Sequence, residues 1–137
     1  MPDRTTLERA RKDKRDGKSP STQAGEFVHE EIKHIREGKH GARSTKQAIA
    51  IGLSKARRAG VTLKPPSPST TSARTRRAAA RDERAGQQKK KRSHKPSARR
   101  AKASLRKLKS EPRSVVSHAA LSRHAKAVAR RKRSAGA

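Results

Sequence analysis

Residues 44–60, which read STKQAIAIGLSKARRAG, decide the fold of the first half of this chain. Ser44 and Gln47 have the spacing of a capping box, in which two side chains satisfy backbone N–H groups at the start of a helix. Gly60 follows the last residue of the periodic pattern and favours the left-handed backbone conformation that ends many helices. We therefore predict one uninterrupted helix between these two signals.

The apolar arc of this helix is made mostly of small residues, which allow a second helix to approach closely. At about 100° per residue, the arc contains Ala48, Ile49, Gly52, Leu53, Ala56 and Ala59, whereas Lys46, Arg57 and Arg58 face away. The match of Ala48, Gly52 and Ser54 to a helix-turn-helix core fails at Arg58, where that motif needs a buried apolar residue. Sequence-specific reading of DNA is therefore not predicted.

The partner of this helix is the segment 21–37, which is amphipathic and stops at Gly38. Its N-cap candidates are Ser21 and Thr22. Phe27 lies at the edge of its apolar arc and is expected in the core, and Glu30 is expected on the opposite, outward face. Together the two helices predict an α-helical hairpin over residues 21–63, and a homodimer through the same apolar faces is possible.

Charge is distributed very unevenly along the 137 residues. Eight of the 11 acidic residues precede Gly38, so residues 1–37 carry a net charge of +1 and residues 38–137 carry +27. Only 28% of the chain is hydrophobic, with one Phe and no Trp or Tyr. High charge with low hydrophobicity favours disorder in the unbound chain.

These patterns predict four regions and an all-α fold class. Residues 1–20 form a flexible arm with at most a frayed helix, 21–63 the hairpin, 64–72 a Pro/Ser-rich linker, and 73–137 a region that we call the basic tail. The basic tail is expected to be low in complexity and largely disordered, with latent helices at 73–85, at 97–110 and from about Ser117. The predicted fold is thus a small helical hairpin with a long, largely disordered basic C-terminal tail that contains latent helices.

The positive charge predicts binding to nucleic-acid phosphates, with duplex DNA as the main partner. The expected function is that of a histone-like, sequence-nonspecific protein that neutralises phosphates and condenses or bridges nucleoid or plasmid DNA. The candidate nucleic-acid-binding residues are Lys46, Arg57, Arg58, Arg74, Arg76, Arg77, Lys89, Lys90, Lys91, Arg92, Arg99, Arg100, Arg106, Lys107, Arg130, Arg131, Lys132 and Arg133.

Two other functions stay open. Arginine-rich segments fold on structured RNA, so an RNA- or ribosome-associated role is one alternative, although single-strand recognition normally uses aromatic platforms and Phe27 is the only aromatic residue of that kind. The other is an adaptor, in which the hairpin binds a protein partner and the basic tail localises it.

No residue pattern predicts an enzyme, a cofactor or a metal site. His29 and His34 flank Glu30, but they are five positions apart and fall about 140° apart around a helix, which does not suit one metal. The sequence has no cysteine, and no secretory signal or membrane-spanning segment is recognised. A soluble, cytoplasmic and nucleoid-associated protein is expected.

Two stretches, 21–31 (STQAGEFVHEE) and 44–60, resemble a family of small basic bacterial proteins known mainly as a domain of unknown function. Some members carry the label plasmid stabilisation protein. The resemblance covers about residues 19–63, and the segment 117–125 is similar to tails of that family. It implies a bacterial cytoplasm and association with nucleoid or plasmid DNA, without catalytic residues. The Lys-, Arg- and Ala-rich tail is similar in composition to linker-histone tails.

Overall fold

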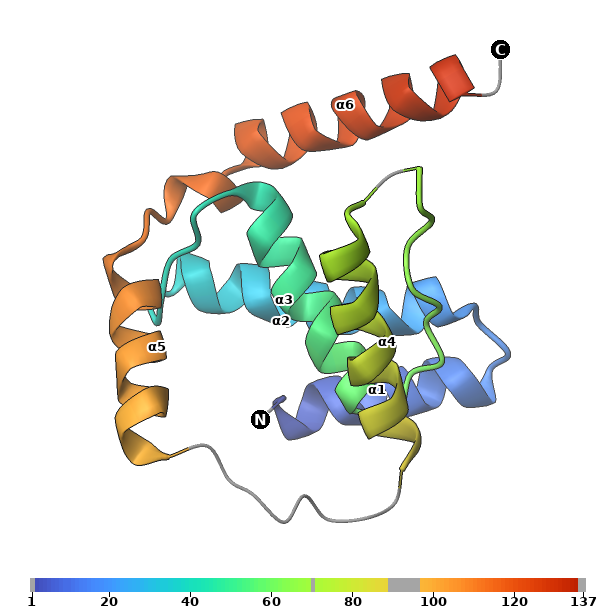
Figure 1. The fold of residues 1–137 in the computed structure, drawn as a ribbon, viewed down its shortest axis with the longest axis horizontal. Helices are drawn as coiled ribbons and strands as arrows, with labels where there is room; N and C mark the ends of the chain where they lie inside the picture. The colour runs from blue at the N-terminus through green and yellow to red at the C-terminus, as the bar shows by residue number, and fades with distance from the viewer. Residues whose placement is uncertain (1, 70, 89–96, 136–137) are drawn as a thin grey trace. The chain divides into compact units, whose positions relative to one another are not determined.

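The computed structural model describes residues 2–69, 71–88 and 97–135 (Figure 1). In these ranges the regular elements are six α-helices and one 3-10 turn: α1 (Arg4–Arg15), α2 (Pro20–Arg36), α3 (Thr45–Arg58), α4 (Ala73–Gln87), α5 (Ala98–Ser110), η1 (Ser114–Val116) and α6 (His118–Ala135). They belong to two compact units. Of the described residues, the first unit contains 2–31 and 50–88, and the second contains 32–49 and 97–135, so α2 and α3 each contribute to both.

The prediction of a long, largely disordered tail is wrong, because α4, α5 and α6 occupy most of the basic tail (Figure 1). A serine hydroxyl precedes each helix and accepts a hydrogen bond from a backbone N–H, with distances of 3.3 Å at Ser72, 3.3 Å at Ser97 and 3.2 Å at Ser117. Such caps satisfy donors that otherwise have no partner in the first turn. The helices lie where latent helices were expected, but composition gave no sign that they form in the free chain.

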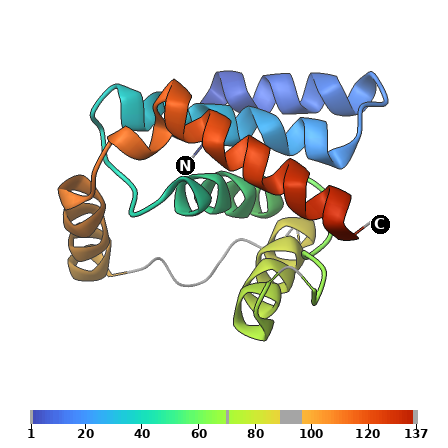
Figure 2. The ribbon, with the colours of Figure 1, turned by 90° about the horizontal axis from the view of Figure 1, so that it is seen from above.

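The core of the first unit is built around Phe27. This ring is fully buried with Ala10, Ala24, Ala56 and Val61, so Phe27 is a core residue, as expected. Helix α1 lies beside α2 (Figure 2) and occupies the segment for which a flexible arm was expected.

Glu30 does not face outward as predicted. It is 4% exposed, and its Oε1 accepts a hydrogen bond of 2.6 Å from the backbone N–H of Asp3. The residues just before α1 therefore cover a position of α2 that would face solvent in an isolated hairpin.

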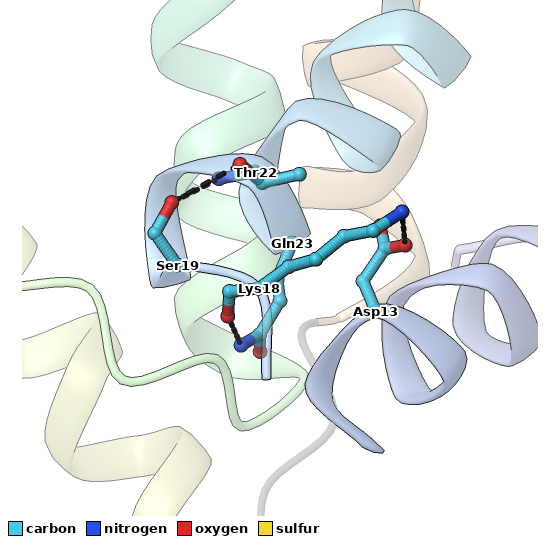
Figure 3. A network of polar contacts seen from close by, with 5 residues as sticks. All are labelled: Asp13, Lys18, Ser19, Thr22 and Gln23. Carbon is cyan, nitrogen blue, oxygen red and sulfur yellow. Dashed lines mark hydrogen bonds and ion pairs between the residues drawn. The ribbon is translucent and has the colours of Figure 1, made fainter. Parts of the chain in front are cut away.

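Helix α2 begins earlier than predicted, because the candidate caps Ser21 and Thr22 both lie inside it. Ser19 is its cap, since the hydroxyl accepts a hydrogen bond of 3.3 Å from the N–H of Thr22, and Pro20 takes the first helical position, where a missing N–H does no harm. The turn from α1 is also held by Lys18, whose Nζ donates to Asp13 at 2.9 Å and whose carbonyl accepts from Gln23 at 3.0 Å (Figure 3).

Helix α3 is a single helix, as the sequence predicted, and both of its ends agree with the expected signals. Ser44 accepts a hydrogen bond of 3.1 Å from the N–H of Gln47. At the other end Gly60 has φ +105°, and the N–H of Val61 donates to the carbonyl of Ala56 at 3.1 Å. This is the Schellman arrangement, which satisfies carbonyls of the last helical turn.

The second unit joins the loop after α2 to the end of α5 through backbone contacts. The N–H of Gly41 donates to the carbonyl of Leu108 at 2.7 Å, and that of Ala42 donates to Pro112 at 3.0 Å. A Cβ atom at Gly41 would overlap the carbonyl of Glu111. A small core of Ile35, Ala42, Ala48 and Val116 lies in the same unit.

Candidate nucleic-acid interface

Helix α6 presents a stripe of exposed cations. Arg123, Lys126, Arg130 and Arg133 follow one another at intervals of three or four residues, so they share one side of the helix, and all four are exposed. Leu121 and Val128 lie on the opposite side and are half-buried. Arg131 and Lys132 are exposed outside the stripe, so all four residues of the predicted basic run at 130–133 are open to solvent.

Helix α5 carries six Lys and Arg residues and no acidic residue in its 13 positions. The predicted contacts Arg99, Arg100, Arg106 and Lys107 are all exposed. No residue of α5 is buried, and Leu105 is 45% exposed on the narrow apolar side of the helix. The helix therefore offers most of its surface to a partner.

Arg57 was predicted to face outward, and this is wrong. Its side chain is 7% exposed, and its Nε and Nη2 each donate at 3.1 Å, to the carbonyls of Leu63 and Lys64 respectively. Burial lowers the pKa of the guanidinium, and Asp82 and Glu83 partly oppose this effect. These hydrogen bonds hold the segment after α3 against the helix, so Arg57 is not placed to contact phosphates.

Arg58 is exposed but already paired with a carboxylate of α4. Its Nε donates to Oδ1 of Asp82 at 2.8 Å, and the Ser54 hydroxyl donates to Oδ2 at 2.6 Å. Burial alone would raise the pKa of Asp82, but the hydrogen bonds from Ser54 and Arg58 and the charges of Arg58 and Arg57 outweigh it, so the pKa lies below its usual value. Asp82 stays ionised and connects α3 to α4.

The remaining predicted contacts are divided between the two units. Lys46 is exposed near the start of α3 in the second unit, whereas Arg74 and Arg77 are exposed and Arg76 is half-buried on α4 in the first. The predicted run of Lys89, Lys90, Lys91 and Arg92 lies outside the described residues. The structure thus places exposed predicted cations on each of α4, α5 and α6.

Sequence reasoning missed two arginines in the second unit. Arg36 and Arg113 line a shallow depression of about 400 Å³ with Ser114, Val116 and Ser117. The Nε and Nη2 of Arg36 donate to the carbonyl of Val116 at 3.3 and 3.2 Å. These residues are 80 positions apart, so no local pattern could have connected them.

Comparisons with known proteins give one partial match. Residues 11–67 match the model of a family of unknown function (DUF6496). The matched residues include the segment 19–63 that resembled a domain of unknown function, and they exclude the basic tail. No curated protein matches the chain, and no solved structure does. Among the described residues, no helix has both the length and the apolar character needed to cross a membrane.

Proposed function

We propose that this chain is a histone-like, sequence-nonspecific DNA-binding protein whose helices α5 and α6 contact the phosphate backbone. One observation carries the proposal. Residues 97–135 contain 13 Lys and Arg residues, all of them exposed, against a single acidic residue, Glu111, which gives a net charge of +12. Backbone phosphates are the partner that neutralises such a surface without requiring a particular base sequence.

A purely solubilising surface would be built differently. Solvent-exposed helices usually mix both signs of charge, because like charges three or four residues apart destabilise a helix. The exposed cations of α5 and α6 stand at such intervals with no acidic neighbour inside either helix. An anionic polymer relieves this repulsion, which favours association at low salt.

The helical state of the basic tail also supports tight contacts. A disordered polycation loses conformational entropy wherever it becomes ordered on DNA. In α6 the cations already share one side of a capped helix, so less ordering accompanies binding. The association with nucleoid or plasmid DNA that the family resemblance implies is consistent with this role.

A fluorescence-anisotropy titration tests the proposal. Labelled duplexes of unrelated sequence are titrated with the full chain at salt concentrations from about 50 to 500 mM. We expect the duplexes to bind with equal affinity, and we expect the slope of log K against log salt to be about −0.9 for each phosphate contacted. Binding that is absent at low salt, insensitive to salt, or confined to one duplex contradicts the proposal. Stronger competition by structured RNA than by duplex DNA would indicate that the protein binds RNA instead.

A further inference from the structure

An open depression in the first unit lies between the linker and α4. Pro65, Pro66 and Pro68 line it from the linker, and Ala73, Arg76 and Arg77 line it from α4. Its volume is about 440 Å³, within the usual range of sites for small molecules. The lining combines apolar proline rings with two guanidinium groups, and such a surface suits a ligand that is part ring and part anion.

Arg76 carries a donor that lacks an acceptor. Its Nε is buried, and none of the described residues offers that atom a hydrogen-bond partner. A buried N–H without an acceptor loses its hydration and gains nothing in return. Rotation about the side-chain bonds would turn the guanidinium toward the depression, where an anion could accept from Nε and a terminal nitrogen together.

The charges around the depression favour an anion. Helix α4 carries Arg74, Arg76, Arg77, Arg81 and Arg84. The carboxylate of Asp82 is held by Ser54 and Arg58 on α3, so it does not neutralise the two lining arginines. Glu83 is the other acidic residue of this helix, and the balance of charge on α4 is positive.

We propose that this depression binds one nucleotide unit, with the phosphate on Arg76 and Arg77 and the ring against the proline face. The puckered proline rings present apolar C–H faces against which a planar base can pack, and a guanidinium forms paired hydrogen bonds to phosphate oxygens. The site goes beyond the backbone contacts proposed for α5 and α6. It gives the first unit a way to hold an unpaired nucleotide without an aromatic side chain.

The test is calorimetric titration of the full chain with thymidine 5′-monophosphate at low salt. We expect Arg76→Gln to weaken binding by about tenfold or more, as loss of a charge-assisted pair of hydrogen bonds does. Arg81→Gln removes the same charge from an exposed position of α4 that does not line the depression, and it should weaken binding by less than about threefold. Equal losses in the two variants would overturn the proposal.

Two further measurements test the phosphate contact and the ring contact separately. Inorganic phosphate should bind more weakly than the nucleotide, and Pro66→Ala should weaken the nucleotide but not phosphate, since it removes a ring and no charge. Phosphate binding as strong as nucleotide binding would refute the ring contact. If circular dichroism shows that Arg76→Gln does not fold, Pro66→Ala still tests the site. Duplex binding is measured in parallel, because its absence would contradict the proposed function without bearing on this site.

Discussion

At the scale of single residues, Gly52 shows why small side chains matter in this fold. A Cβ atom there would stand 2.6 Å from Cα of Val28, which is main chain and has no room to move aside. The pair lies where α2 and α3 cross in the first unit. The sequence predicted a close helix approach along the small-residue arc, and at Gly52 that approach leaves no room for a side chain.

We expect Gly52→Ala to lower the free energy of unfolding by about 1 to 3 kcal/mol, because the added methyl forces the two helices apart. Gly25→Ala is the matched control, since Gly25 is also helical and a methyl group added there would meet nothing within 4 Å. That change should be neutral or stabilise by up to about 1 kcal/mol, through the higher helix propensity of alanine. Urea denaturation followed by circular dichroism measures both, and equal effects would contradict the close approach.

The Asp82 carboxylate gives the chain a predictable response to acid. Its pKa is lowered from the ordinary value of 3.8, so it binds protons less readily in the folded chain than in the unfolded chain. The stability that this group contributes is therefore present above pH 3.8 and is lost as the pH falls through the lowered value.

Comparison of the wild type with Asp82→Asn isolates this effect. We expect the variant to be less stable by about 1 kcal/mol at neutral pH, because the amide keeps only one acceptor oxygen and lacks the charge that pairs with Arg58. The difference should shrink toward zero as the pH drops below 3.8. A difference that is constant down to the lowest pH that keeps the protein folded would argue against a charge effect.

At the scale of elements, the positions of helices were predictable and their surroundings were not. Ser44, Ser97 and Gly60 are local signals, and the helices begin and end beside them. Contacts between distant segments leave no such signal, as with the backbone hydrogen bond from Gly41 to Leu108. The average charge of the basic tail predicted disorder, because an average takes no account of the serine caps at the starts of its three helices.

The candidate site was predictable to a similar degree. Charge runs correctly indicated the exposed cations of α5 and α6, since nothing in those segments competes for them. Arg57 was misplaced because its partners are carbonyls beyond the helix. The sequence contains one indication of this role for Arg57. Pro65 and Pro66 have no N–H, and the extended chain before them has carbonyls without local hydrogen-bond donors, which a side chain such as that of Arg57 can satisfy.

The stripe on α6 predicts that charge loss depends on which side of the helix it affects. Arg130→Gln, within the stripe, should reduce the slope of log affinity against log salt for duplex DNA by about 0.9. Lys132→Gln removes one charge from the side shared with Leu121 and Val128, and it should change the slope by clearly less. Both residues are exposed, so neither variant should alter the helical signal. Equal slopes for the two variants would mean that α6 has no preferred binding side.

At the scale of the whole molecule, order is distributed unevenly among the helices. Helices α2 and α3 contain fully buried residues, including Phe27, Ile35 and Ala56, whereas α5 contains none. An isolated helix of about 13 residues is marginal in water. The six cations of α5 add repulsion, which an anionic partner would offset.

Hydrogen–deuterium exchange measured by mass spectrometry should reveal this gradient. We expect the amides of α5 to exchange at least about tenfold faster than those in the middle of α2 and α3, because local opening of α5 uncovers no core. Addition of duplex DNA at low salt should slow exchange in α5 and α6 and leave α2 unchanged. Protection of α5 equal to that of α3 in the free chain would refute the gradient.

The arrangement of the first unit bears on what the segment shared with other proteins can do alone. The matched segment, 11–67, omits Ala10 and ends before α4, yet Ala10 belongs to the Phe27 core and the backbone of Gly86 lies directly against that of Arg57. A fragment of residues 11–67 would lack Asp82, whose carboxylate accepts hydrogen bonds from Ser54 and Arg58. It would also leave part of the Phe27 core uncovered. We therefore expect residues 11–67 alone to be less stable than the complete first unit.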